Sequence, residues 1–222
     1  MSSRCLTKQE IKAQAASLGF VACGVVQAAP VEEPFAAHYL RRVQLGHFAG
    51  MDYMTRHVEM RLQPALLHPG VQTIVSLALN YMPARRQPAL CLYAQGEDYH
   101  DVMRGRLRML MERLGAHGRC FVDTAPVMER YWAWRSGVGT LCRNGLVAVP
   151  GYGPTVFLGE LFLEEPCDAF DVPLQPSPAL DEGWQDFCPA LTPQRLDARL
   201  CINYWTIEHR GELPQELRLT DT

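Results

Sequence analysis

The segment 71–81 is the strongest strand signal in the chain and constrains the fold more than any other stretch. Its centre, Ile74-Val-Ser-Leu-Ala-Leu79, is nearly continuous in apolar residues, which is typical of a strand covered on both faces. Further strands are expected over 20–26, 146–149 and 156–163, the last two as an antiparallel pair joined through a Pro-Gly-Tyr-Gly-Pro link. Helical patterns surround these strands, so the sequence predicts an α+β sandwich.

Residues typical of helix starts predict three helices in the first half of the chain. Thr7 and Glu10 form a capping box for a first helix that Gly19 ends. A second helix is expected over 34–44. Asp98 would satisfy the N-terminal amides of a long third helix, whose apolar residues recur at steps of four and three. These apolar residues are Tyr99, Met103, Leu107, Leu110 and Leu114.

Length and composition bound the organisation of the chain. Its 222 residues are 48% hydrophobic and 20% charged, enough for one good core and too few for two comfortable domains. From 164 to 185 the composition shifts to Pro, Asp and Glu without periodicity, and a helical pattern returns around 192–210. We therefore expect an α+β core over 1–165, followed over 166–222 by a linker and a C-terminal helix that wrap as a tail.

Charge and hydropathy argue against several classes of protein. The formal net charge is -3 at pH 7, which provides no global field to hold a polyanion. Lys8, Glu10 and Lys12 interrupt the N-terminal apolar positions, and no apolar run reaches the length of a membrane span. A cytoplasmic protein without a membrane segment is expected.

The cysteines are scattered. There are eight, and no two are closer than thirteen residues apart. No C-x-x-C or other tight ligand pair exists, so the sequence offers no local framework for a zinc or iron–sulfur site. Mostly buried thiols in a reducing compartment are expected.

The stretch Phe121-Val-Asp-Thr-Ala-Pro-Val-Met-Glu-Arg130 is the candidate centre of the site. A short apolar run ends on a carboxylate, and Pro126 stands where the first turn of a helix accepts proline. Asp123 is thus expected at the carboxyl end of a strand, where ligands collect in α/β architectures. Two alternatives stay open: Asp123 caps the helix that begins at Pro126, or it acts in catalysis.

Two other stretches are candidates for pocket walls. Three alternatives stay open for His100, in the first turn of the long helix: it lines a pocket, contacts a bound group or lies on the surface as an ordinary histidine. The run 137–145 is rich in glycine but lacks the G-x-G-x-x-G spacing after a strand, so a dinucleotide fingerprint is rejected. It fits a loop whose backbone approaches another group closely.

Val122-Asp-Thr-Ala-Pro-Val-Met-Glu-Arg130 resembles the V-D-[ST]-A-P-[IV]-[LM]-E-R signature of the epoxyqueuosine reductase family. These are cobalamin-dependent enzymes that make the last reduction of queuosine biosynthesis on tRNA. Other segments are similar to the family in the same order, over nearly the whole chain. They are Gly50-Met-Asp-Tyr-Met54, Arg61 through Pro64 to Pro69-Gly70, Tyr93-Ala-x-Gly-x-Asp-Tyr-His100, Leu158-Gly-Glu-Leu161 and the segment 201–218.

The resemblance implies a nitroreductase-like, cobalamin-binding fold that holds the cofactor in its base-off form near the edge of the sheet. It also implies that Asp123 donates a proton to the substrate. Reductive removal of an oxygen requires such an acid beside the source of electrons. The cofactor-binding residues it suggests are Tyr93, Asp98, Tyr99, His100, Arg130, Gly139, Cys142, Asn144, Val147 and Leu158.

Two departures from the family pattern change what is expected. Of the cysteines that hold two [4Fe-4S] clusters in the family, only Cys188 and Cys201 remain, and the chain ends before the second set. No iron–sulfur cluster is therefore expected. In the family's G-L-G-W-x-G-K-[NHS] loop, Thr140 and Cys142 replace the aromatic residue and a glycine. Cys142 is then a soft ligand near the metal or a small buried thiol.

The function predicted is a corrinoid-binding protein that handles, processes or reduces cobalamin with electrons from an external reductase. The alternative is a cobalamin-dependent reductase of a modified nucleoside or other small molecule that uses a partner electron donor. A weaker alternative replaces cobalamin by flavin. With two cluster cysteines and a net charge of -3, tRNA is not the expected partner.

Overall fold

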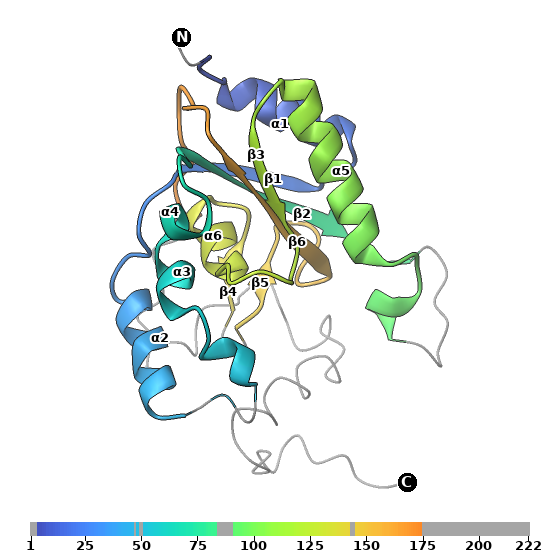
Figure 1. Cartoon of the computed structure of the whole chain (residues 1–222). Helices are drawn as coiled ribbons and strands as arrows, with labels where there is room; N and C mark the ends of the chain where they lie inside the picture. The colour runs from blue at the N-terminus through green and yellow to red at the C-terminus, as the bar shows by residue number, and fades with distance from the viewer. Residues whose placement is uncertain (1–3, 47, 49–50, 84–90, 143–144, 175–222) are drawn as a thin grey trace, which may run out of the picture.

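The structure is a computed structural model that describes residues 4–46, 48, 51–83, 91–142 and 145–174. Within these ranges it contains a mixture of helices and antiparallel strands (Figure 1). The helices are α1 (Lys8–Ser17), α2 (Phe35–Gln44), η1 (Asp52–Met54), α3 (Val58–Leu62), α4 (Pro64–Leu67), η2 (Leu92–Ala94), α5 (Tyr99–Leu114) and α6 (Glu129–Arg135). The strands are β1 (Ala22–Gln27), β2 (Thr73–Asn80), β3 (Gly118–Phe121), β4 (Thr140–Leu141), β5 (Val147–Ala148) and β6 (Val156–Leu163).

The main sheet has four strands in the order β1-β2-β6-β3, and every neighbouring pair is antiparallel. β2 and β6 are the central strands, and seven of the eight residues of β2 are buried. This confirms that the apolar run at 71–81 forms a strand covered on both faces. A second, two-stranded sheet consists of β4 and β5.

Helices cover both faces of the main sheet (Figure 1). On one face, α1 and α5 pack their apolar residues against the side chains of Val75, Leu77 and Leu161. On the other face, α6 and the start of α2 pack against Ile74, Ala78 and Phe162. Alternate residues of β2 and β6 therefore belong to different cores, as the two-residue period of a strand requires.

The start signals of two helices are confirmed. Thr7 is the N-cap of α1, and its side chain accepts a hydrogen bond from the amide of Glu10 at 3.2 Å. Asp98 is the N-cap of α5 and accepts from the amide of His100 at 2.9 Å. α5 buries Met103, Leu107, Leu110 and Leu114, so the apolar spacing also predicted its inner face correctly.

Two expectations about the second half are wrong. The helix predicted from Pro126 begins at Glu129, because residues 122–128 form an irregular turn. The predicted hairpin between 146–149 and 156–163 does not form, since β5 pairs with β4 whereas β6 joins the main sheet between β2 and β3. The glycines and prolines of the link turn the chain tightly, with an isolated bridge between Val149 and Gly153, and separate the two strands.

The described part of the expected linker packs against the core. Leu6 donates its amide to the carbonyl of Pro166 at 2.9 Å, and Asp168 donates its amide to the carbonyl of Leu6 at 2.9 Å. Asp171 binds the amide of Val25 in β1 through its side chain at 3.0 Å. The division of the chain at 165/166 stays a prediction, and the expected C-terminal helix lies outside the described residues.

No helix in the ranges that the structure describes is long and apolar enough to cross a membrane.

Candidate functional site

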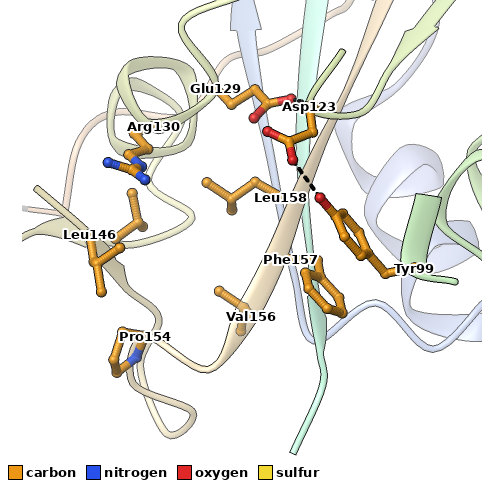
Figure 2. Close-up of a pocket in the computed structure, with 10 residues that line it drawn as sticks. Tyr99, Asp123, Glu129, Arg130, Leu146, Pro154, Val156, Phe157 and Leu158 are labelled. Atoms are coloured by element: carbon orange, nitrogen blue, oxygen red, sulfur yellow. Dashed lines mark hydrogen bonds between the residues drawn. The ribbon is translucent and has the colours of Figure 1, made fainter. Parts of the chain in front are cut away.

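A pocket of about 190 Å³ opens beside the start of β6. Figure 2 shows its walls: the ring of Tyr99 on one side, the side chains of Arg130 and Leu146 on the other, and the carboxyl groups of Asp123 and Glu129 at one end. The lining residues come from α5, the β3–α6 turn, α6, β5 and β6. They are Tyr99, Asp123, Glu129, Arg130, Leu146, Val147, Pro154, Val156, Phe157 and Leu158.

Asp123 stands two residues after β3 ends, in the left-handed backbone region with φ of 58°. Its amide donates a hydrogen bond to Oε1 of Glu129 at 2.6 Å. The N-cap of α6 is Met128 and no side chain caps it by a hydrogen bond, so the alternative that Asp123 is a helix cap is wrong. The side chain of Asp123 is 60% exposed and is available to a ligand in the pocket.

Tyr99, the first residue of α5, donates its hydroxyl to Oδ2 of Asp123. Its ring stacks on Phe157 with centroids 4.0 Å apart and planes 10° from parallel. Burial, followed by the hydrogen bond and the charge of Asp123, raises the pKa of Tyr99 well above its ordinary value. The hydroxyl therefore stays protonated and acts as a donor to the carboxylate.

His100 lies beside this pair. Its Nδ1 is 2.8 Å from Oδ1 of Asp98, and its Nε2 is 3.9 Å from Oδ2 of Asp123. The hydrogen bond from the backbone of His100, and then that from its ring, lower the pKa of Asp98. Asp98 thus orients the imidazole of His100, whose side chain is 29% exposed and is not among the residues that line the pocket.

Two glutamates complete a cluster of carboxyl groups with Asp123. Burial raises the pKa of Glu129 to about 7, and the charge of Asp123 adds to the effect. Glu160, in the middle of β6, is fully buried. Its burial, together with the charges of Glu129 and Asp123, raises its pKa well above the ordinary value. At neutral pH the cluster therefore retains at least one proton.

The predicted cofactor residues fall into three groups. Tyr99, Arg130, Val147 and Leu158 line the pocket. His100 lies next to the pocket because its ring approaches Asp123, and Asp98 contacts His100 from the other side. Tyr93, Gly139 and Cys142 are not among its lining residues in the described ranges: Tyr93 lies exposed on η2, Gly139 packs on Val147 and Ala148, and Cys142 is buried. Asn144 lies outside the described residues.

Cys142 takes the position of a small buried thiol. It is 3% exposed, its Sγ lies 3.8 Å from the carbonyl of Thr140, and its amide donates to the carbonyl of Leu146 at 2.7 Å. These contacts hold the turn between β4 and β5, as expected for a small buried side chain.

Several site residues were missed from the sequence. Glu129 stands in the quoted signature, yet only its neighbour Arg130 was named as a site residue. Glu160 interrupts the apolar strand Val156-Phe-Leu-Gly-Glu-Leu-Phe-Leu163. A lone carboxylate inside a buried strand is costly, and that signal could have identified it. The apolar residues Leu146, Pro154, Val156 and Phe157 carry no signal apart from their place in the fold.

Together these features define an α+β protein with a carboxylate–tyrosine cluster at one end of an apolar-walled pocket. No group of three or more His, Cys, Asp or Glu side chains that could hold a metal ion occurs in the described part of the chain.

Comparison with known proteins identifies the family. The model of the family described as epoxyqueuosine reductase QueG, DUF1730, matches residues 61–124. The epoxyqueuosine reductase of Pseudomonas aeruginosa is 38% identical over 95% of this chain and 63% of its own length. That of Leadbetterella byssophila is 37% identical over 95% of this chain and 72% of its own. The chain belongs to the epoxyqueuosine reductase family.

Solved structures agree with this assignment. A selenomethionine-labelled epoxyqueuosine reductase is 28% identical with a TM-score of 0.70, over 94% of this chain and 59% of that one. An epoxyqueuosine reductase with an epoxyqueuosine-modified tRNA-Tyr stem loop gives the same values. The catabolic reductive dehalogenase NpRdhA, 15% identical with a TM-score of 0.50, shares the fold over 77% of this chain. The chain thus spans between 59% and 72% of the length of these epoxyqueuosine reductases.

Proposed function

We propose that this chain is a corrinoid-binding protein that holds cobalamin at the pocket beside Tyr99 and supplies a proton there through Asp123. Electrons come from an external donor. One observation carries the proposal: Asp123, Tyr99 and Glu129 converge from separate elements at one end of a pocket whose other walls are mostly apolar. An acid beside an apolar surface is what proton delivery to a bound, reduced ligand requires.

The residues fit part of such a cofactor rather than the whole of it. Pockets that enclose drug-sized ligands measure roughly 300–1,000 Å³, whereas this one measures about 190 Å³. It would therefore accept one edge of a corrinoid, or a reacting group next to it, against Leu146, Val156 and Leu158. When bound, cobalamin would supply the electron-rich metal centre, and the remaining chemistry belongs to the side chains.

Each polar residue then has a distinct role. Tyr99 donates to Oδ2 of Asp123 and fixes the direction of the carboxyl group. Glu129 accepts the amide of Asp123 and holds the turn on which it stands. Arg130 places a positive charge on the opposite wall (Figure 2), where it can bind an anionic substituent of the ligand.

The source of electrons is part of the proposal. In the segment 181–201, which resembles the part of the family that carries the first cluster motif, the cysteines are Cys188 and Cys201, and a four-iron cluster requires four ligands. We therefore propose that this chain holds no iron–sulfur cluster and takes electrons from an external reductase in the cytoplasm. Iron analysis of the purified protein tests this: about four irons per chain would contradict it.

The first experiment is a visible-absorption titration of the protein with hydroxocobalamin and with cob(II)alamin. A saturable shift to a base-off spectrum is expected. Asp123→Asn should bind with an affinity within about twofold of wild type, because the pocket walls are unchanged. No shift at any corrinoid concentration would exclude the proposal, and a shift of bound flavin mononucleotide in its place would favour the flavin alternative.

A second candidate is reduction of a modified nucleoside, favoured by the intact cluster around Asp123 and by the tRNA-bound relative of TM-score 0.70. It predicts turnover of an epoxyqueuosine-containing stem loop with a chemical reductant. Turnover should fall about 10²-fold or more in Asp123→Asn and stay near wild type in Asp101→Asn, the same change made in the first turn of α5 at a residue that does not line the pocket. Stem-loop binding should weaken steeply with salt. If wild-type protein binds corrinoid but neither binds nor reduces the stem loop, cofactor handling is the function.

A further inference from the structure

Glu160 is a buried carboxyl group that hydrogen bonding does not explain. The residue is fully buried, and neither Oε1 nor Oε2 has a hydrogen-bond partner among the described residues. Ser76 is its cross-strand neighbour in β2, and the buried Oγ of Ser76 is also without a partner within those ranges. Unpaired buried polar groups are rare because each one destabilises the fold by about 1–3 kcal/mol. Glu160 and Ser76 therefore require a physical explanation.

The register of the sheet shows where this pair lies. Gly24, Ser76, Glu160 and Phe121 are aligned across β1, β2, β6 and β3. Because side chains alternate between the two faces of a strand, these residues lie on the same face of the sheet as Ile74, Ala78 and Phe162, which pack against α6. This row of four aligned residues therefore lies beneath α6. Gly24 and Ser76, the two smallest of the four, leave room there for the carboxyl group of Glu160.

The position of α6 brings Glu129 over Glu160. At the C-terminal end of the helix, the backbone oxygen of Ser136 lies so close to Gly24 that a Cβ there would be 2.2 Å from it. The seven residues of α6 span about 10 Å, which is about two strand spacings. Ser136 lies against β1 and the helix contacts both β2 and β6, so we infer that its first residue, Glu129, lies on the β6 side.

The charged groups around the two glutamates are few. Glu129 and Asp123 are the charged groups that act on Glu160. Asp123, Arg130 and Arg61 act on Glu129, and the carboxylate raises its pKa whereas both arginines lower it. Among the described residues, no arginine or lysine acts on Glu160, and a buried carboxylate without a positive partner takes up a proton.

We propose that Glu160 and Glu129 hold one shared proton beneath α6 and that this pair resupplies Asp123. The inference rests on the proposed role of Asp123 as the proton donor. When Asp123 gives its proton to an acceptor in the pocket, it becomes a carboxylate. A proton then passes from the glutamate pair to a carboxyl oxygen of Asp123, and the pair regains one proton from water. No electrons move in this step.

The shared proton is tested in the cofactor-free protein by ¹³C NMR of the glutamate carboxyl carbons, with the signals assigned in Glu129→Gln and Glu160→Gln. The signal of Glu160 should remain that of a neutral acid well above the pH at which an ordinary glutamate ionises. Its titration should move to lower pH in Glu129→Gln, and both glutamates should titrate lower in Asp123→Asn, since each change removes a negative charge. Glu165→Gln, a buried carboxyl bound to His117, should move neither curve.

The resupply is tested in the corrinoid-loaded protein. Glu160→Gln should leave corrinoid affinity unchanged and slow the proton-requiring reduction about tenfold above about pH 7, with a smaller loss at lower pH. Any of three results would overturn the inference. The first is an ionised Glu160 at neutral pH, and the second is a Glu160 titration curve that does not change in Glu129→Gln or Asp123→Asn. The third is a pH–rate profile of Glu160→Gln equal to that of wild type. Failure of the wild-type protein to bind corrinoid would overturn the proposed function instead and leave the NMR result to stand.

Discussion

Asp123 shows how one residue's backbone conformation builds the site. A positive φ is uncommon for a residue other than glycine, and aspartate is among the side chains that tolerate it best. Here the left-handed conformation directs the amide to Glu129 and the carboxyl group to the hydroxyl of Tyr99. The surrounding hydrogen bonds hold a conformation that the chain would otherwise adopt rarely.

The raised pKa of Glu129 makes the stability of the protein depend on pH. A carboxyl whose pKa rises from 4.5 to about 7 on folding binds more protons in the folded state between these values. Stability therefore falls as pH increases through this window. The contribution of Glu129 to this change is on the order of 3 kcal/mol, and Glu129→Gln, which keeps an acceptor for the amide of Asp123, should lack that contribution. Denaturant unfolding of both proteins at about pH 5 and about pH 8 measures the difference. Equal pH dependence would refute the prediction.

At the scale of elements, α6 connects the site to the sheet. One end of the helix carries Glu129 and Arg130 into the pocket, and the other end rests on Gly24 of β1. Between them, Trp132 and Ala133 are buried in the core beside Ile74 and Phe162. The glycine in β1 thus sets how closely the whole helix approaches, and hence where its first residues lie.

Gly24→Ala should displace this helix. The added Cβ would lie 2.2 Å from the backbone oxygen of Ser136 and 2.6 Å from its Oγ, and overpacking of this kind costs about 1–3 kcal/mol. The variant should be less stable and should bind corrinoid more weakly, because Glu129 and Arg130 move with α6. Gly105→Ala is the control: a Cβ there, in α5, meets nothing within 4 Å, and the change should stabilise the protein by about 0.5–1 kcal/mol. Equal stability of the two variants would show that the close approach is not restrictive.

At the scale of the molecule, the segment after β6 returns to the N-terminal elements (Figure 1). Asp171 is its anchor: the side chain is 16% exposed, lies 2.8 Å from Nζ of Lys12 and 3.3 Å from Nζ of Lys8, and accepts the amide of Val25. The two lysines belong to α1 and Val25 to β1, so one carboxylate joins three segments of the chain.

Asp171→Ala should therefore destabilise the protein by about 1.5–3 kcal/mol, the usual value for hydrogen bonds to a charged group. Asp171→Asn should cost less, because its amide oxygen can still accept from Val25. Thermal unfolding in low and high salt measures both changes, and the difference between wild type and Asp171→Asn should shrink as salt screens the lysines. Glu97→Ala, on an exposed turn, is a control expected to change little. Equal effects of the alanine and asparagine changes would mean that the hydrogen bond to Val25 contributes nothing.

The sequence by itself determined the local elements and predicted Asp123 as the candidate acid. The capping residues Thr7 and Asp98, the apolar spacing of α5 and the buried strand β2 were all predicted, since each depends on neighbours in sequence. The motif around Asp123 predicted the family that the comparisons confirm. The resemblance also predicted Tyr99, Arg130, Val147 and Leu158 as site residues, and all four line the pocket.

Only the tertiary structure decided which distant segments meet. The pairing of β6 with β2 and β3, instead of with β5, depends on contacts between residues far apart in sequence. The same pairing places Glu160 beneath α6 and beside Ser76. Helix capping and strand burial are local free energies that a short stretch of sequence specifies. The proton affinity of a carboxyl group depends on burial and on charges from other elements, and these exist only once the chain has folded.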